Sequence, residues 1–174
     1  MRENIAKIGK FFDKVTHVTS GVSIYVCIVL LVAWVGLYGV YIIGRAFLPF
    51  PLGWIFVEET TEYWVLFLAL FSPSYALRTG KHVNIDVVTS HLPEKVRNVL
   101  MVITTLVALV IACYIVKQGV IGALYGLGVG IRSVGPLNML LWPVYMFIPI
   151  GFILLSLELV SHLCHSILRL TKSK

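Results

Sequence analysis

Long apolar segments alternate with short polar ones along the chain, and this pattern predicts four membrane-spanning helices. A bilayer core about 30 Å thick requires roughly 20 residues of helix. The segments that meet or nearly meet this length lie at residues 18–44, 56–77, 98–118 and 136–164. The second is the weakest match, because Tyr63–Leu77 reaches full length only by including Glu62, Glu59 and Glu58. We therefore predict an all-α integral membrane protein that forms a single membrane domain over residues 1–174.

Composition favours the same class of protein. Of the 174 residues, 59% are hydrophobic and 13% are charged, whereas soluble domains are about half apolar and about a quarter charged. The mean hydropathy is +0.93. The first apolar segment is much longer than the roughly 7–15 residues of a secretory signal, so we expect it to remain in the mature protein.

The distribution of Lys and Arg predicts that both chain ends face the cytoplasm (N-in, C-in). With four spans, one side of the membrane receives the N-terminal segment, the elbow at 78–97 and the C-terminal segment. Eleven of the 14 basic residues lie there, and the loops at 45–55 and 119–135 with their flanks hold only Arg45, Lys117 and Arg132. Cytoplasmic segments are enriched in such cations, so those two loops are expected to be periplasmic. The net charge of +6 is then explained by anionic phospholipid headgroups, and no nucleic-acid partner is predicted.

The residues before the first span form an amphipathic pattern. One helical stripe is apolar and the cations lie largely off it; the stripe consists of Ile5, Ile8, Phe12 and Val15, and the cations are Lys7, Lys10 and Lys14. This pattern predicts an N-terminal interfacial amphipathic helix. The alternative is that these residues are the charged cytoplasmic end of the first span.

Catalytic, metal and cofactor sites are not predicted. His82, Asp86 and His91 lack the further ligands of a metal centre, and no nucleophile in a recognisable turn accompanies the His–Asp pair. The histidines lie near the expected cytoplasmic side, whereas axial haem ligands would occur in pairs at mid-membrane depth. The three cysteines have no ligand-like spacing and are interpreted as small apolar residues. We therefore expect a protein that is not an enzyme.

Polar residues at the ends of the second and fourth spans have two interpretations each. Glu58 and Glu62 share a helix face. One interpretation is an acidic helix N-terminus, which the helix dipole stabilises; the other is an ion pair with Arg45 or a docking surface for a partner on the outer side. Glu158 is either paired or snorkelling at the interface, or it forms an ion pair with another subunit.

Glycine and proline mark the region around the fourth span. Gly122, Gly126 and Gly130 follow the four-residue spacing that allows helices to approach closely; the alternative is a flexible outer connection. Pro136 is expected to begin the fourth span, and Pro143 and Pro149 to bend or unwind it.

Three motifs in this order resemble the small membrane subunit (Q-type, DctQ-like) of tripartite ATP-independent periplasmic (TRAP) transporters. The first consists of Trp54, Glu58 and Glu59; the second of Arg78, Gly80, His82, Val83, Ile85 and Asp86; the third of Pro136, Trp142, Tyr145, Pro149 and Gly151. The second motif is the most specific. The family often has an arginine soon after the Glu-Glu pair, and the sequence "EETTEYW" has none, so an ion pair with that arginine is not carried over.

The resemblance implies a scaffold subunit of a secondary transporter that imports organic acids with a sodium gradient. Its expected partners are the large membrane (M-type) subunit, a periplasmic substrate-binding protein and phospholipid, and its expected location is the bacterial inner membrane. Arg78, His82 and Asp86 would then pin the elbow to headgroups and to the large subunit. A stand-alone structural tetraspan protein and a small oligomeric exporter are the alternatives. The exporter would be expected to carry an ionisable residue within 18–44, which contains none.

Overall fold

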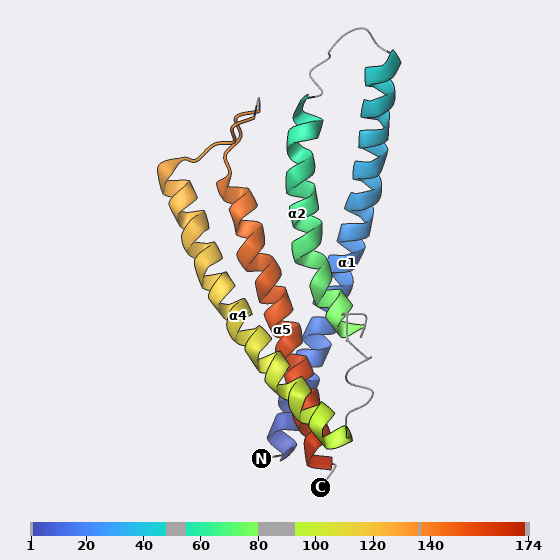
Figure 1. Cartoon of the computed structure of the whole chain (residues 1–174), viewed down its shortest axis with the longest axis vertical. Coiled ribbons are helices and arrows are strands. Elements are labelled where there is room, and N and C mark those ends of the chain that lie inside the picture. Colours follow the sequence, from blue (N-terminus) through green and yellow to red (C-terminus); the bar gives the residue numbers. More distant parts are fainter. Residues whose placement is uncertain (1, 48–54, 80–92, 136, 173–174) are drawn as a thin grey trace.

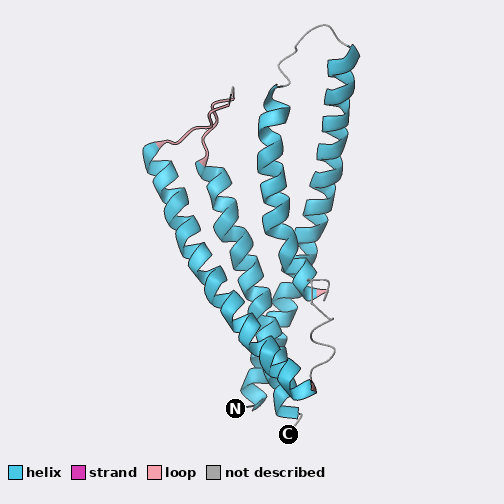
Figure 2. Ribbon diagram, in the orientation of Figure 1, coloured by secondary structure: helices cyan, strands magenta, loops and turns pink. Residues whose placement is uncertain are grey.

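The computed structural model describes residues 2–47, 55–79, 93–135 and 137–172. Four helices account for almost all of them: α1 (Arg2–Phe47), α2 (Ile55–Arg78), α4 (Glu94–Val129) and α5 (Trp142–Lys172). Figure 2 shows helix joined by loops throughout the described chain. The predicted all-α class is confirmed.

The helices run alternately up and down, so α1 begins and α5 ends at the same end of the molecule (Figure 1). We call this the terminal end, and we call the opposite end, where residues 131–141 join α4 to α5, the hairpin end. Helix α5 is central because it packs against each of the other three helices, and α1 also packs against α2. The helices lie close together at the terminal end and spread apart toward the hairpin end (Figure 1).

Helix α4 packs against α5 along a stripe of small and polar residues. Five buried residues recur every seven positions, Asn98, Thr105, Ala112, Gly119 and Gly126, and Ala123 is buried between the last two. A Cβ atom on Gly119 would lie 2.8 Å from Cδ of Pro149, and one on Gly126 would lie 3.1 Å from the Tyr145 ring. The glycines are therefore needed because the two helices approach so closely.

The predicted four-residue glycine spacing is correct at Gly126 and wrong at its neighbours. Gly122 and Gly130 have no atom within 4 Å of an added Cβ. Gly130 instead ends α4 in the left-handed conformation, with φ 68°, which an L-residue adopts at a cost. The close contact uses a seven-residue repeat, the spacing of residues on one helix that face a neighbouring helix over several turns.

Helix α2 joins the bundle through aromatic rings and a second glycine contact. Phe67 and Phe71 of α2 stack on each other and meet Phe147 of α5 edge-on. A Cβ on Gly151 of α5 would lie 2.8 Å from the carbonyl oxygen of Leu70. The α2–α5 contact is therefore tight near the middle of both helices.

Three helix boundaries differ from those predicted. The N-terminal amphipathic segment is not a separate helix, because α1 continues without a break from Arg2 to Phe47. Helix α4 continues to Val129, so residues 119–129 are helical and not a loop, since their apolar side chains and glycines continue the surface that packs on α5. At the elbow, residues 94–97 already belong to α4.

Helix α5 begins later and ends later than the predicted fourth span, 136–164. Helix α5 starts at Trp142 and runs to Lys172, and Pro136, the predicted start, lies outside the described residues. Pro143 is in the first turn of α5, where its missing N–H costs nothing, so it does not interrupt the helix. Only Pro149 lies deep inside α5.

Within the described residues, three helical segments are long and apolar enough to cross a bilayer: Asp13–Phe47, Val96–Val129 and Trp142–Ile167. Helix α2 is not among them, in keeping with its three glutamates near the N-terminus. Few of the side chains in the first and second of these segments are buried within the chain. The protein is a multi-pass membrane protein.

Candidate functional site

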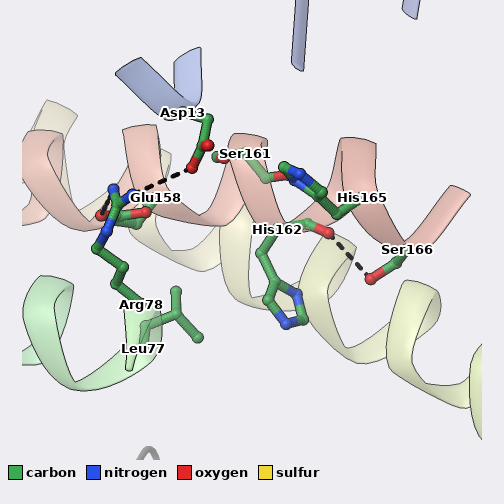
Figure 3. Close-up of a pocket in the computed structure, with 8 residues that line it drawn as sticks. All are labelled: Asp13, Leu77, Arg78, Glu158, Ser161, His162, His165 and Ser166. Carbon is green, nitrogen blue, oxygen red and sulfur yellow. Dashed lines mark hydrogen bonds and ion pairs between the residues drawn. The ribbon is translucent and has the colours of Figure 1, made fainter. Parts of the chain in front are cut away.

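Arg78 lies at the centre of an ion cluster that joins three helices at the terminal end (Figure 3). Its Nη2 atom lies 3.2 Å from Oδ1 of Asp13 in α1, and its Nη1 atom lies 3.4 Å from Oε1 of Glu158 in α5. The same Nη1 donates a hydrogen bond of 3.1 Å to the Thr16 hydroxyl. We call Asp13, Thr16, Arg78 and Glu158 the Arg78 cluster.

The local sequence explains why each charge lies there. Arg78 is the last residue of α2, where the helix dipole favours a cation. Glu158 faces inward from α5, and its side chain is only 6% exposed, compared with 21% for Arg78 and 52% for Asp13. A buried carboxylate needs a counter-ion close by, so Glu158 depends on Arg78 more than Asp13 does.

A cavity of about 250 Å³ lies beside the cluster. Its lining is mostly polar and consists of Asp13, Leu77, Arg78, Glu158, Ser161, His162, His165 and Ser166. The α5 side chains there also bond along their own helix: the Ser166 hydroxyl donates to the carbonyl of His162 at 2.9 Å. Nδ1 of His162 lies 3.5 Å from the Thr105 hydroxyl of α4. All four helices therefore meet around this end of α5.

A second ion pair lies toward the hairpin end, between α1 and α2. Nη1 of Arg45 lies 3.0 Å from Oε1 of Glu58, with side chains 73% and 52% exposed. The Tyr41 hydroxyl donates a hydrogen bond to the same carboxylate and accepts one of 3.2 Å from Arg45. The Arg45 ion pair, predicted as one interpretation of Glu58, is confirmed.

Glu59 connects α2 to the segment between α4 and α5. Its Oε2 atom accepts a hydrogen bond of 2.9 Å from the Leu137 N–H, and the carboxylate occupies the space that a side chain at residue 135 would need, so Gly135 is required there. Its Oε1 atom is buried and has no hydrogen-bond partner among the described residues. The segment itself is a short hairpin, closed by bonds from Ser133 N to Met139 O (2.8 Å) and from Leu141 N to Ile131 O (3.0 Å).

The structure brings some of the predicted motif residues together and leaves others apart. Arg78, Glu58 and Glu59 each make the contacts given above. Gly80, His82, Asp86, Trp54 and Pro136 lie outside the described residues. The remaining residues of the third motif, Trp142, Tyr145, Pro149 and Gly151, belong to the packing surfaces of α5 against α4 and α2.

Sequence reasoning missed Asp13, Thr16 and Thr105 as members of this end of the molecule. A signal for Asp13 was present, because Asp13 and Glu158 each flank an apolar segment at the end that also receives Arg78. Acids and a cation placed at the same level of neighbouring helices are expected to pair. No group of three or more His, Cys, Asp or Glu side chains within the described ranges is arranged to hold a metal ion.

Comparison with protein families gives one match. The family model described as "Tripartite ATP-independent periplasmic transporters, DctQ component" matches residues 34–169, which is well over half of the chain. The chain belongs to the DctQ family. It is therefore a small membrane component of a tripartite transporter, as the resemblance of its motifs indicated. The matched range includes Glu58, Arg78 and Glu158 and excludes Asp13. The comparisons with curated proteins and with solved structures found no match.

Proposed function

We propose that this DctQ-family chain is the static membrane subunit of a sodium-driven importer of organic acids in the bacterial inner membrane. Its partners are a large membrane subunit, which carries the substrate across, and a periplasmic binding protein, which delivers it. Phospholipid contacts the exposed helix faces that no partner subunit covers. The family match over residues 34–169 carries this proposal.

The contacts within the chain support a static role. The Arg78 cluster joins α1, α2 and α5 at one end, and Glu59 joins α2 to the 131–141 hairpin at the other. Between them, glycines allow α5 to approach both α4 and α2 closely. These contacts hold the helices of the chain together as one rigid body, which a support for a moving partner requires.

The spacing of the charged residues supports four spans with both chain ends in the cytoplasm. Glu58 and Arg78 lie 20 residues apart in α2, which corresponds to about 30 Å of helix. This equals the thickness of the hydrocarbon core. Helix α2 is thus long enough to cross with Arg78 at one surface and Glu58 at the other. The excess of cations at the terminal end supports a cytoplasmic location for that end.

The elbow and the outer loop contain the rest of the proposed partner contacts. In the proposed topology, Gly80, His82 and Asp86 follow Arg78 on the cytoplasmic side, where headgroups and the large subunit are within reach. Trp54 precedes Glu58 on the periplasmic side, at the depth that tryptophan prefers.

Reconstitution tests the proposal. Proteoliposomes with the large subunit, this chain and the binding protein should take up a labelled carboxylate under an inward sodium gradient. Omitting this chain should abolish uptake, and this chain alone should carry nothing. Transport by this chain alone, or full uptake without it, would contradict the proposal.

Topology is tested by labelling single cysteines in a background in which the native cysteines are replaced. A membrane-impermeant thiol reagent added to spheroplasts should label a cysteine at the exposed position of Val134 and leave one at Thr79 unlabelled until the cells are opened. Labelling of Thr79→Cys from outside would refute the assigned orientation.

A further inference from the structure

Lys117 of α4 is a cation at the middle depth of the bundle. Contacts between α4 and α5 fix its height: Thr105 lies next to His162, Gly119 next to Pro149 and Gly126 next to Tyr145. Lys117 is therefore level with the part of α5 around Pro149 to Gly151, which is the middle of its uncharged stretch, Trp142–Leu157.

Neither end of the bundle is within reach of the Lys117 side chain. Glu158 of the Arg78 cluster is seven residues of α5 beyond Gly151, so about 10 Å of helix separate the level of Lys117 from that of the cluster; about 13 Å separate Lys117 from Gly126, at 1.5 Å per residue. A lysine side chain is shorter than either distance, so it cannot place its ammonium group at an interface by snorkelling alone. The sequence pattern placed Lys117 at the periplasmic end of the third span, 98–118, whereas α4 continues to Val129 and Lys117 lies well inside the helix.

Lys117 also faces away from the rest of the chain. It is two residues before Gly119, which places it about 200° around the helix from the seam with α5. Its side chain is exposed, and no hydrogen bond or ion pair joins it to any part of the chain that the structure describes. An unpaired charge at this depth in lipid is costly, and such residues generally pair with a partner.

The residues around Lys117 form a second seam on the outward face of α4. They are spaced alternately by four and three residues, all are exposed, and they are Ile103, Val107, Val110, Tyr114, Lys117, Ile121 and Leu124. We call this set the outward seam. Spacing of this kind is typical of a face that packs along another helix. Gln118, beside it, donates a hydrogen bond of 2.9 Å to the Tyr114 hydroxyl, so the seam near Lys117 carries two further polar groups.

A second copy of this chain cannot supply the missing countercharge. The acidic residues of the four described helices lie near one end or the other: Glu3, Asp13, Glu94 and Glu158 toward the terminal end, and Glu58, Glu59 and Glu62 toward the hairpin end. A copy with the same orientation would place lysine beside lysine through this face. The partner must therefore be a different chain.

From the outward seam and the depth of Lys117, we infer that α4 packs in the membrane against a helix of the large membrane subunit that carries an Asp or Glu level with Lys117. The choice of that subunit rests on the proposed function, and the contact face and the ion pair go beyond it. The carboxylate and the ammonium group would both lie in the low-dielectric interior of the membrane. Their mutual attraction would offset the free-energy cost of removing each charge from water.

Photo-crosslinking in the assembled transporter tests the contact face. A photoreactive amino acid at Val110, Ile121 or Leu124 should crosslink to the large subunit, at a peptide whose apolar stretch contains an acidic residue. The matched control is Val32 of α1, 67% exposed, which should give no such product. Lipid adducts alone, or a crosslink only to a second copy, in a complex that remains assembled would overturn the inference and leave the proposed function intact. If the unmodified chain does not co-purify with the large subunit, the proposed function fails, and the inference with it.

Charge variants test the ion pair. Lys117→Met leaves the partner's carboxylate unpaired and should lower the fraction of large subunit that co-purifies by about tenfold or more. Lys117→Arg should retain most of it, and Ile121→Met, on the same face, should leave it unchanged. Co-purification of Lys117→Met at the level of the unmodified chain would overturn the ion pair, because a neutral residue at this depth does not hinder insertion.

Discussion

The two ends of the bundle are held by ion pairs of opposite character. At the terminal end, Arg78 and Glu158 are 21% and 6% exposed and join α2 to the central helix α5. At the hairpin end, Arg45 and Glu58 are 73% and 52% exposed and join α1 to α2. Burial makes the first pair costly to break, since a lone charge would remain in the interior, whereas water solvates both partners of the second. The helices accordingly converge at the terminal end and spread at the other (Figure 1).

Removing Arg78 should produce the largest effect. Arg78→Met leaves Glu158 buried without its cation and should lower the free energy of unfolding by about 3–5 kcal/mol. The unfolding transition in detergent, followed by intrinsic tryptophan fluorescence, measures this. The double variant Arg78→Met/Glu158→Met removes both charges and should regain most of the loss. If the single and double variants are equally unstable, the buried charge is not the cause.

Packing near the middle of the bundle should have the next largest effect. Gly119→Ala and Gly151→Ala each force a Cβ to within 2.8 Å of a neighbouring heavy atom, and overpacking of this kind costs about 1–3 kcal/mol. The matched control is Gly122→Ala on the same helix as Gly119, where nothing lies within 4 Å; it should be neutral or slightly stabilising, because alanine favours helix. Equal unfolding transitions for Gly119→Ala and Gly122→Ala would contradict the close seam.

The Glu59 contact should have a local effect. Glu59→Ala removes the acceptor of the Leu137 N–H, a hydrogen bond to a charged group that contributes about 1.5–3 kcal/mol. Hydrogen exchange of the amides at 131–141 should become faster while those of α4 and α5 stay protected. Glu59→Gln keeps an oxygen acceptor, so the amides at 131–141 should exchange more slowly in this variant than in Glu59→Ala. Unchanged exchange in Glu59→Ala would show that Glu59 does not hold the hairpin.

The exposed pair should matter least. Arg45→Gln and Glu58→Gln should each change the free energy of unfolding by less than about 1 kcal/mol, because both side chains remain in contact with water. Comparison with Arg78→Met under the same conditions tests the difference between the two ends directly. If Arg45→Gln lowers the free energy of unfolding as much as Arg78→Met does, the two ends of the bundle do not differ as described.

Periodicity and charge were enough to predict the helices but not all of their ends. Segments without charges predicted α1, α4 and α5, because an uncharged run of about 20 apolar residues matches the length of helix that crosses a bilayer. Lys117 and the glycines after it suggested a loop, yet α4 continues because Gly119, Ala123 and Gly126 are buried against α5. Such a partner lies on another helix and leaves no trace in the local sequence.

The candidate site was only partly visible in the sequence. The motif around Arg78 marked the residue, and its position at the end of α2 made a cytoplasmic location the natural interpretation. Arg78 pairs with Asp13 and Glu158 because of the way α1, α2 and α5 pack, and the sequence does not specify this packing. The Arg45–Glu58 pair was easier to predict, because both residues flank the same short loop.

The central claim is that this chain behaves as one rigid body while its partner moves. It is tested most directly by the distance between spin labels at Val35 in α1 and Val129 in α4, introduced into a cysteine-free background of the assembled transporter. We expect the same narrow distance distribution with sodium alone and with sodium, binding protein and substrate. A second distance, several Å away, that appears only during transport would contradict the claim.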